Sequence, residues 1–223
     1  MIGPASGFRA RAGAALMGAA LALAAFPGAQ AQPAPQLPES SQDAAIMCFY
    51  SAVLTGRGQA EPMAEAMWFL FDAARTATAD APDGFVDKVE ELVAAPPPNL
   101  DTLTTDAPAM LPQCASRYPL ISSKRAITLP ADAFARDMQC LALTIYLSDM
   151  AQGDLDDTGS EAFVTRLQAL ETRLTARLTP ERYQAAGLAD EAARNLALAR
   201  ALRDVSPIGN LMSILTACEA AAA

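Results

Sequence analysis

Four cysteines are the residues of this chain best suited to chemistry, and their setting favours structural disulfides over catalysis. Cys48, Cys114, Cys140 and Cys218 all lie in apolar stretches, where the thiolate needed for redox chemistry is disfavoured. None belongs to a Cys-x-x-Cys motif, so the paired ligands typical of a zinc site are missing as well. In an exported protein we therefore expect two disulfides.

The chain has no histidine, which excludes several common kinds of active site and metal site. Without it the chain cannot carry out Ser-His-Asp or Cys-His catalysis, form the usual zinc hydrolase motifs or bind haem through histidine. No Gly-x-Gly-x-x-Gly or P-loop motif is present. Paired carboxylates such as Glu90 and Glu91 remain, but spacing alone does not place two acids across a cleft. We expect no cofactor and no enzymatic activity.

One acidic segment, Asp-Leu-Asp-Asp-Thr-Gly at 154–159, resembles the first half of an EF-hand calcium loop. Asp154, Asp156 and Thr158 would supply oxygen ligands at positions 1, 3 and 5, with glycine at position 6. Position 12 is Thr165, where an EF-hand has a bidentate glutamate. The simpler interpretation is that the acids precede a helix and stabilise its N-terminus. The segment is a weak candidate for calcium, and no other metal site is expected.

The elements that carry the cysteines follow helical spacing. The run 133–147 is apolar all round and should be a buried central helix, and 44–54 is a shorter run of the same kind. No run has the alternation of a strand, so we predict an all-α fold of about eight helices. Trp68-Phe69-Leu70-Phe71 could form an exposed patch for a partner, but a helix buried on two sides is favoured.

A weak internal repeat suggests how the cysteines pair. Cys48 and Cys140 lie in the first helix of each half, while Cys114 and Cys218 each follow a leucine by three residues at the end of a half. Four cysteines allow three pairings, and the repeat selects Cys48–Cys114 and Cys140–Cys218. We predict two tandem four-helix units, each closed by a disulfide. If the halves are unrelated, the other pairings stay open.

The N-terminus has the layout of a secretory signal peptide. Arg9 and Arg11 precede an apolar run that ends at Pro27-Gly28, and Ala29-Gln30-Ala31 is a cleavage signal. Loss of residues 1–31 would change the net charge from −9 to −11. So acidic a chain should avoid nucleic acid, and we expect no stable membrane insertion after the signal is removed.

These patterns predict five segments and a compartment. The segments are a signal peptide (1–31), a disordered lead-in (32–43), a first helical repeat (44–118), a linker (119–130) and a second helical repeat (131–221). The expected location is the bacterial periplasm or the medium. We expect a non-catalytic binding protein, chaperone-like or an assembly factor, with a protein partner. The alternative is a carrier that holds a hydrophobic small molecule inside the bundle.

Overall fold

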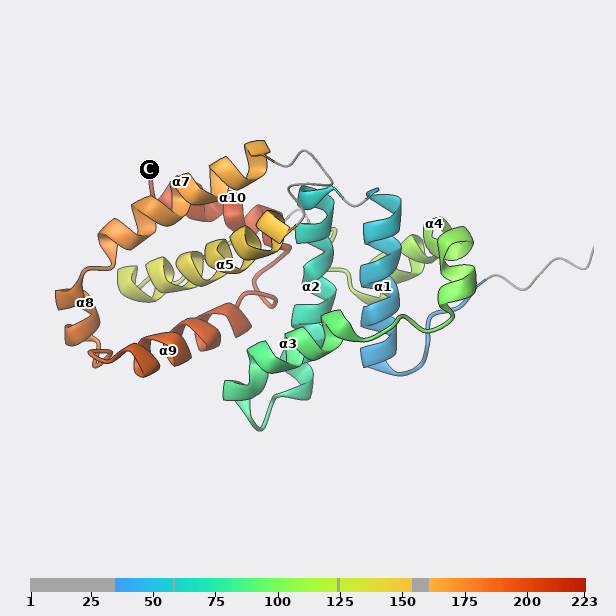
Figure 1. The fold of residues 1–223 in the computed structure, drawn as a ribbon, viewed down its shortest axis with the longest axis horizontal. Helices are drawn as coiled ribbons and strands as arrows, with labels where there is room; N and C mark the ends of the chain where they lie inside the picture. Colours follow the sequence, from blue (N-terminus) through green and yellow to red (C-terminus); the bar gives the residue numbers. More distant parts are fainter. Residues whose placement is uncertain (1–34, 58, 124, 154–160) are drawn as a thin grey trace, which may run out of the picture. The chain divides into compact units, whose positions relative to one another are not determined.

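The computed structural model describes residues 35–57, 59–123, 125–153 and 161–223, which form nine α-helices, one turn of 3-10 helix and no strand. The prediction of an all-α fold is confirmed. Figure 1 labels these elements. Their bounds are α1 Ser41–Thr55, α2 Ala60–Ala77, η1 Pro82–Gly84, α3 Phe85–Ala94, α4 Leu100–Arg117, α5 Ala133–Gly153, α7 Glu161–Arg177, α8 Pro180–Ala185, α9 Glu191–Arg203 and α10 Leu211–Ala221.

Several helices begin at a residue whose side chain caps the first turn. Ser40, Thr179, Asp190 and Asn210 each accept a hydrogen bond from the main-chain N–H three residues later. Such a cap satisfies one of the main-chain donors that a helix leaves open at its start. Ile208 has helical spacing with the apolar residues of α10 but precedes the cap at Asn210, so it is not part of that helix.

The first half is built around α1. This helix packs against α2, α3 and α4, and the hydroxyl of Tyr50 donates to the main-chain oxygens of Val93 and Ala95, 3.3 Å away. Pro108 and Pro112 lie inside α4, where each removes a main-chain donor. The helix nevertheless continues through both prolines, and its axis changes direction along its length (Figure 1).

The second half is built around α5, the apolar helix predicted to be central. It packs against α7, α9 and α10 in addition to α2 of the first half. Its Asp137 is buried and forms an ion pair of 2.9 Å with Arg182 of α8. Because a buried charge needs a partner, this pair fixes the short helix α8 near the start of α5.

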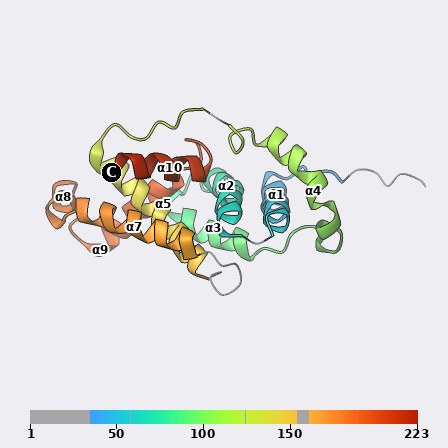
Figure 2. The same ribbon diagram turned by 90° about the horizontal axis from the view of Figure 1, so that it is seen from above.

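One continuous core joins the two halves. Figures 1 and 2 show α2 between α1 and the helices of the second half. Trp68, Phe69, Leu70 and Phe71 of α2 are at most 2% exposed, so the burial favoured from the sequence is confirmed. The ring of Phe71 lies edge-on to that of Tyr146 of α5, with centroids 5.0 Å apart. The halves thus share a core and are not separate bundles.

The chain ahead of α1 differs from the sequence expectation. Order was expected to begin near residue 43 or 44, but α1 begins at Ser41, and residues 35–39 form hydrogen bonds with α4. Among the described residues, no helix has the length and apolarity needed to cross a bilayer.

Candidate functional site

Both disulfides join the residues that the repeat predicted. Cys48 is bonded to Cys114 and Cys140 to Cys218, with Cα atoms 5.6 and 5.5 Å apart. Each bond joins the first helix of a half to its last, α1 to α4 and α5 to α10. All four residues are at most 1% exposed and none is a free thiol. The cysteines therefore hold the helices and offer no nucleophile.

The weak calcium candidate, Asp154, Asp156 and Thr158, lies outside the described residues. Within them, no group of three or more Cys, Asp or Glu side chains is arranged to hold a metal ion. The site that the structure does offer is a hollow between helices.

This hollow, the α1–α2–α4 groove, has a volume of about 350 Å³. It lies where α1 ends and α2 begins, with α4 and the start of the 119–130 segment on the opposite side. Most of its lining is apolar. The lining residues are Ala52, Thr55, Gly56, Pro62, Glu65, Ala66, Phe69, Leu111, Cys114, Ala115, Ile121 and Ser122.

Small residues leave this space open. Ala52, Ala66 and Ala115 present single methyl groups to the groove, and Gly56 presents no side chain. A Cβ atom on Gly56 would stand 2.7 Å from Cβ of Pro62 and 3.1 Å from the main-chain oxygen of Ala52. The end of α1 and the start of α2 can approach this closely only because residue 56 is glycine.

The Cys48–Cys114 disulfide makes the groove rigid. Cys114 is part of the lining, and its bond to Cys48 ties α4 to the middle of α1. The buried ring of Phe69 forms another part of the lining, and it lies edge-on to Tyr118 at the end of α4, with centroids 5.4 Å apart. Walls that are fixed before a ligand arrives lower the entropic cost of binding.

Of the lining residues that the structure describes, Glu65 alone has an ionisable side chain. Although the residue is exposed as a whole, the walls partly desolvate its carboxyl group, and this burial raises its pKa. Among the described residues it forms no ion pair, while Glu61 one turn earlier lies 3.7 Å from Arg166. The groove therefore combines apolar walls with one carboxylate that would gain from a cation.

Two further hollows between helices are smaller. One of about 200 Å³ lies between α3, α5 and α9, with Tyr146, Asp149 and Asn195 in its lining. Burial raises the pKa of Tyr146, and the negative charge of Glu90 raises it further by a smaller amount. The other, of about 260 Å³, lies between α5 and α9. The described residues that line a fourth hollow, of about 510 Å³, all belong to α7, so it is an open surface of that helix.

Sequence reasoning found the cysteines but not the groove. Glu65 is one of 25 acidic residues, and nothing in its local sequence separates it from the others. The small residues that open the groove come from three helices and become neighbours only on folding. Comparison with protein-family models, curated proteins and solved structures finds no match.

Proposed function

We propose that the protein is a non-catalytic binding protein of the bacterial periplasm or the medium, and that the α1–α2–α4 groove takes an apolar group of a partner protein. One observation carries the proposal: in the part of the chain that the structure describes, the side chains of the lining are apolar apart from two hydroxyl groups and the carboxyl of Glu65. Catalysis needs several reactive groups converging on one point. A recognition site needs apolar walls and a few polar groups that fix orientation.

The shape of the groove favours a side chain delivered by a partner over a free small molecule. Its volume of about 350 Å³ is near the lower end of the range for small-molecule sites, about 300–1,000 Å³. It also opens to solvent between Thr55 and Ser122, both of which are exposed. A free ligand would remain partly exposed to water there. An anchoring side chain would instead be shielded from water by the surrounding protein–protein interface.

The negative charge of this protein indicates which side chains of the partner lie next to its apolar group. Glu65 lies in the lining, and the chain carries a net charge of −9, or −11 without residues 1–31. An acidic surface attracts a basic partner and accelerates the encounter. The partner segment should therefore present an apolar side chain next to lysine or arginine.

The proposed compartment rests on two features. Two buried disulfides are typical of proteins that fold in an oxidising compartment outside the cytoplasm. The arginines at 9 and 11, the apolar run and the Ala-x-Ala signal are typical of a secretory leader. This leader is the reason for proposing the periplasm or the medium in place of the cytoplasm.

A small-molecule carrier is the second candidate, and the hollow between α3, α5 and α9 favours it. There Tyr146, Asp149 and Asn195 surround an apolar floor and could orient a small ligand. A carrier purified from its own host should contain a stoichiometric apolar molecule, visible by native mass spectrometry. A protein without such a molecule would favour the interaction function.

Site-specific photo-crosslinking in the native host tests the proposal directly. A photoreactive amino acid at Ser122, on the rim of the groove, should give a discrete protein adduct. The same amino acid at Gln168, an exposed residue of α7, should not give that adduct. Glu65→Lys, which reverses the charge of the lining, should reduce the Ser122 adduct at least tenfold. Equal adducts at both positions would contradict a partner at the groove.

A further inference from the structure

On another face of α4, Gln113 binds main-chain groups of the segment ahead of α1. Its Nε2 donates to the main-chain oxygen of Pro35 at 2.6 Å, and its Oε1 accepts from the main-chain N–H of Leu37 at 3.2 Å. One carboxamide therefore satisfies an acceptor and a donor on either side of Gln36. We call residues 35–39 the strap.

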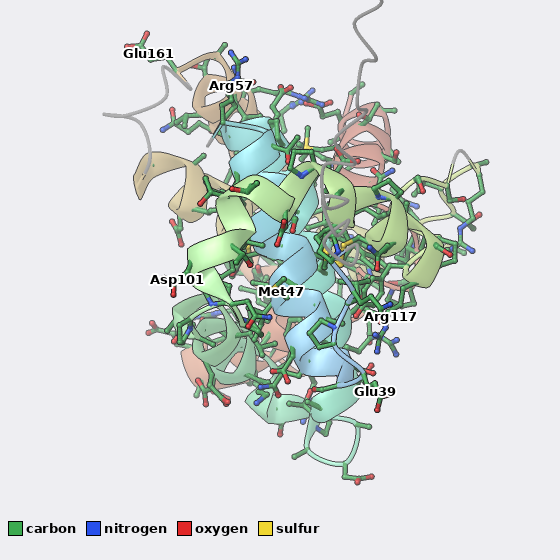
Figure 3. All side chains as sticks on the ribbon, turned by 90° about the vertical axis from the view of Figure 1, so that its right-hand side faces the viewer. Glu39, Met47, Arg57, Asp101, Arg117 and Glu161 are labelled. Carbon is green, nitrogen blue, oxygen red and sulfur yellow. A yellow bond between two sulfur atoms is a disulfide. The ribbon has the colours of Figure 1, made fainter. Side chains whose placement is uncertain are left out.

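Arg117, one turn further along α4, continues the same contact. Its guanidinium donates to the main-chain oxygens of Pro38 at 2.6 Å and Glu39 at 2.9 Å. Figure 3 shows Arg117 of α4 close to Glu39 of the strap. Positions 113 and 117 share one face of the helix because they are four residues apart. Two side chains thus bind four main-chain groups of a segment with no helical structure.

A side-chain contact adds selectivity to this main-chain recognition. Leu37 is partly buried and packs against a small cluster of Met47, Leu103 and Met110, next to Tyr50. Figure 3 labels Met47 on α1, in the same view as Arg117 and Glu39. Main-chain hydrogen bonds with one pocket for a side chain are the means by which proteins recognise peptides that are not helical.

The two faces of α4 have different tasks. Leu111, Cys114 and Ala115 line the α1–α2–α4 groove, whereas Gln113 and Arg117 hold the strap. A ligand in the groove therefore does not need to displace the strap. The strap surface is a second site, independent of the function proposed for the groove.

We propose that the face of α4 carrying Gln113 and Arg117 is a peptide-binding site that the chain fills with its own strap. A non-helical segment of a partner protein, with a leucine flanked by proline, binds there after displacing the strap. The strap itself shows the chemistry of this ligand. Because the strap belongs to the same chain, it competes at an effective concentration that reaches millimolar for short connections. The strap therefore prevents ligands of low affinity from occupying the site.

The test measures binding of a fluorescein-labelled peptide, Pro-Ala-Pro-Gln-Leu-Pro-Glu-Ser-Ser, by fluorescence anisotropy. Leu37→Asp in the full chain should release the strap, since it places a charge against an apolar cluster. Gln36→Asp is the matched control, because it adds the same charge at the exposed neighbouring residue. We expect the Leu37→Asp protein to bind the peptide at least tenfold more tightly than either the wild type or the control.

Further variants identify the surface that binds. Gln113→Ala, added to Leu37→Asp, should weaken peptide binding at least tenfold, and a peptide with aspartate in place of leucine should not bind. Far-UV circular dichroism checks the fold, and Leu37→Ala replaces Leu37→Asp under the same criteria if the charged variant does not fold. A folded strap variant that binds the peptide no better than the wild type would overturn the proposal. So would binding that Gln113→Ala leaves unchanged.

Discussion

Trp68 of α2 donates a hydrogen bond from Nε1 to the main-chain oxygen of Ser206, 3.0 Å away and 138 residues later in the chain. Both residues are at most 2% exposed, so this contact lies in the core that the two halves share. A further contact anchors the linker to the second half, because Arg125 of the 119–130 segment donates to the main-chain oxygens of Pro207 and Ile208. The halves are joined by side-chain hydrogen bonds to main-chain oxygens as well as by apolar packing.

This shared core predicts a single unfolding transition. Trp68 is the only tryptophan, and its ring lies where the halves meet, so its fluorescence reports that junction. In urea, the fluorescence midpoint should coincide with the midpoint of far-UV circular dichroism, which reports all helices. Two separate transitions would mean that the halves unfold independently.

Each disulfide should stabilise the fold to a similar degree. The bonds close loops of 66 and 78 residues, and the chain-entropy model gives about 4 kcal/mol for loops of this size. The double variants Cys48→Ala/Cys114→Ala and Cys140→Ala/Cys218→Ala should each lower the free energy of unfolding by about this amount, measured in urea.

Reductant is the control for the disulfide series. It should destabilise the wild type more than either double variant, because each variant has only one bond left to lose. Peptide mapping without reduction checks the pairing itself. A peptide that joins Cys48 to Cys218 would contradict it.

The ion pair between Arg166 of α7 and Glu219 of α10 should make the fold sensitive to acid. Arg166 donates to both carboxylate oxygens, at 2.6 and 2.8 Å, and these hydrogen bonds lower the pKa of Glu219. A carboxyl whose pKa is lower in the folded state stabilises the fold above its unfolded pKa, about 4.3. That contribution is lost as the pH falls through the lowered value.

Glu219→Gln should therefore cost about 1 kcal/mol at pH 7, the size expected for a well-aligned pair near the surface, and little at pH 3. Urea midpoints at both pH values measure this difference. The matched control is Glu171→Gln, a partly exposed residue of α7, which should change neither midpoint. An equal loss at pH 7 and pH 3 would show that the charge of Glu219 has no part in its effect.

The effect of Glu65 on stability should depend on pH in the opposite sense. Burial raises its pKa, so the ionised carboxylate disfavours the folded state once the pH exceeds the unfolded pKa. Glu65→Gln should stabilise the protein at pH 7, by under about 1 kcal/mol because the residue is exposed as a whole, and should have no effect near pH 3. Thermal melts at both pH values provide the measurement. A variant less stable than the wild type at pH 7 would contradict a desolvated carboxylate.

The sequence was sufficient for the features that depend on local spacing. Helical periodicity placed α5 as a buried central helix, and the position of each cysteine within its half selected the correct disulfides.

Features that join distant segments could not be read from the sequence. The α1–α2–α4 groove depends on how closely α1 approaches α2, which Gly56 and Pro62 set only after folding. The strap looked like a disordered lead-in because its prolines and polar residues are typical of linkers. Its partners, Gln113 and Arg117, lie more than 70 residues away and carry no motif.

The central claim is that the α1–α2–α4 groove binds a partner, and the most direct test fills the groove. Ala115 lines it, and Ser116 is the exposed neighbouring residue on α4. With the photoreactive amino acid at Ser122, Ala115→Trp should remove at least nine-tenths of the protein adduct formed in the host. Ser116→Trp, the matched control, should leave the adduct unchanged. An adduct of equal yield in the Ala115→Trp protein, folded by circular dichroism, would contradict the account.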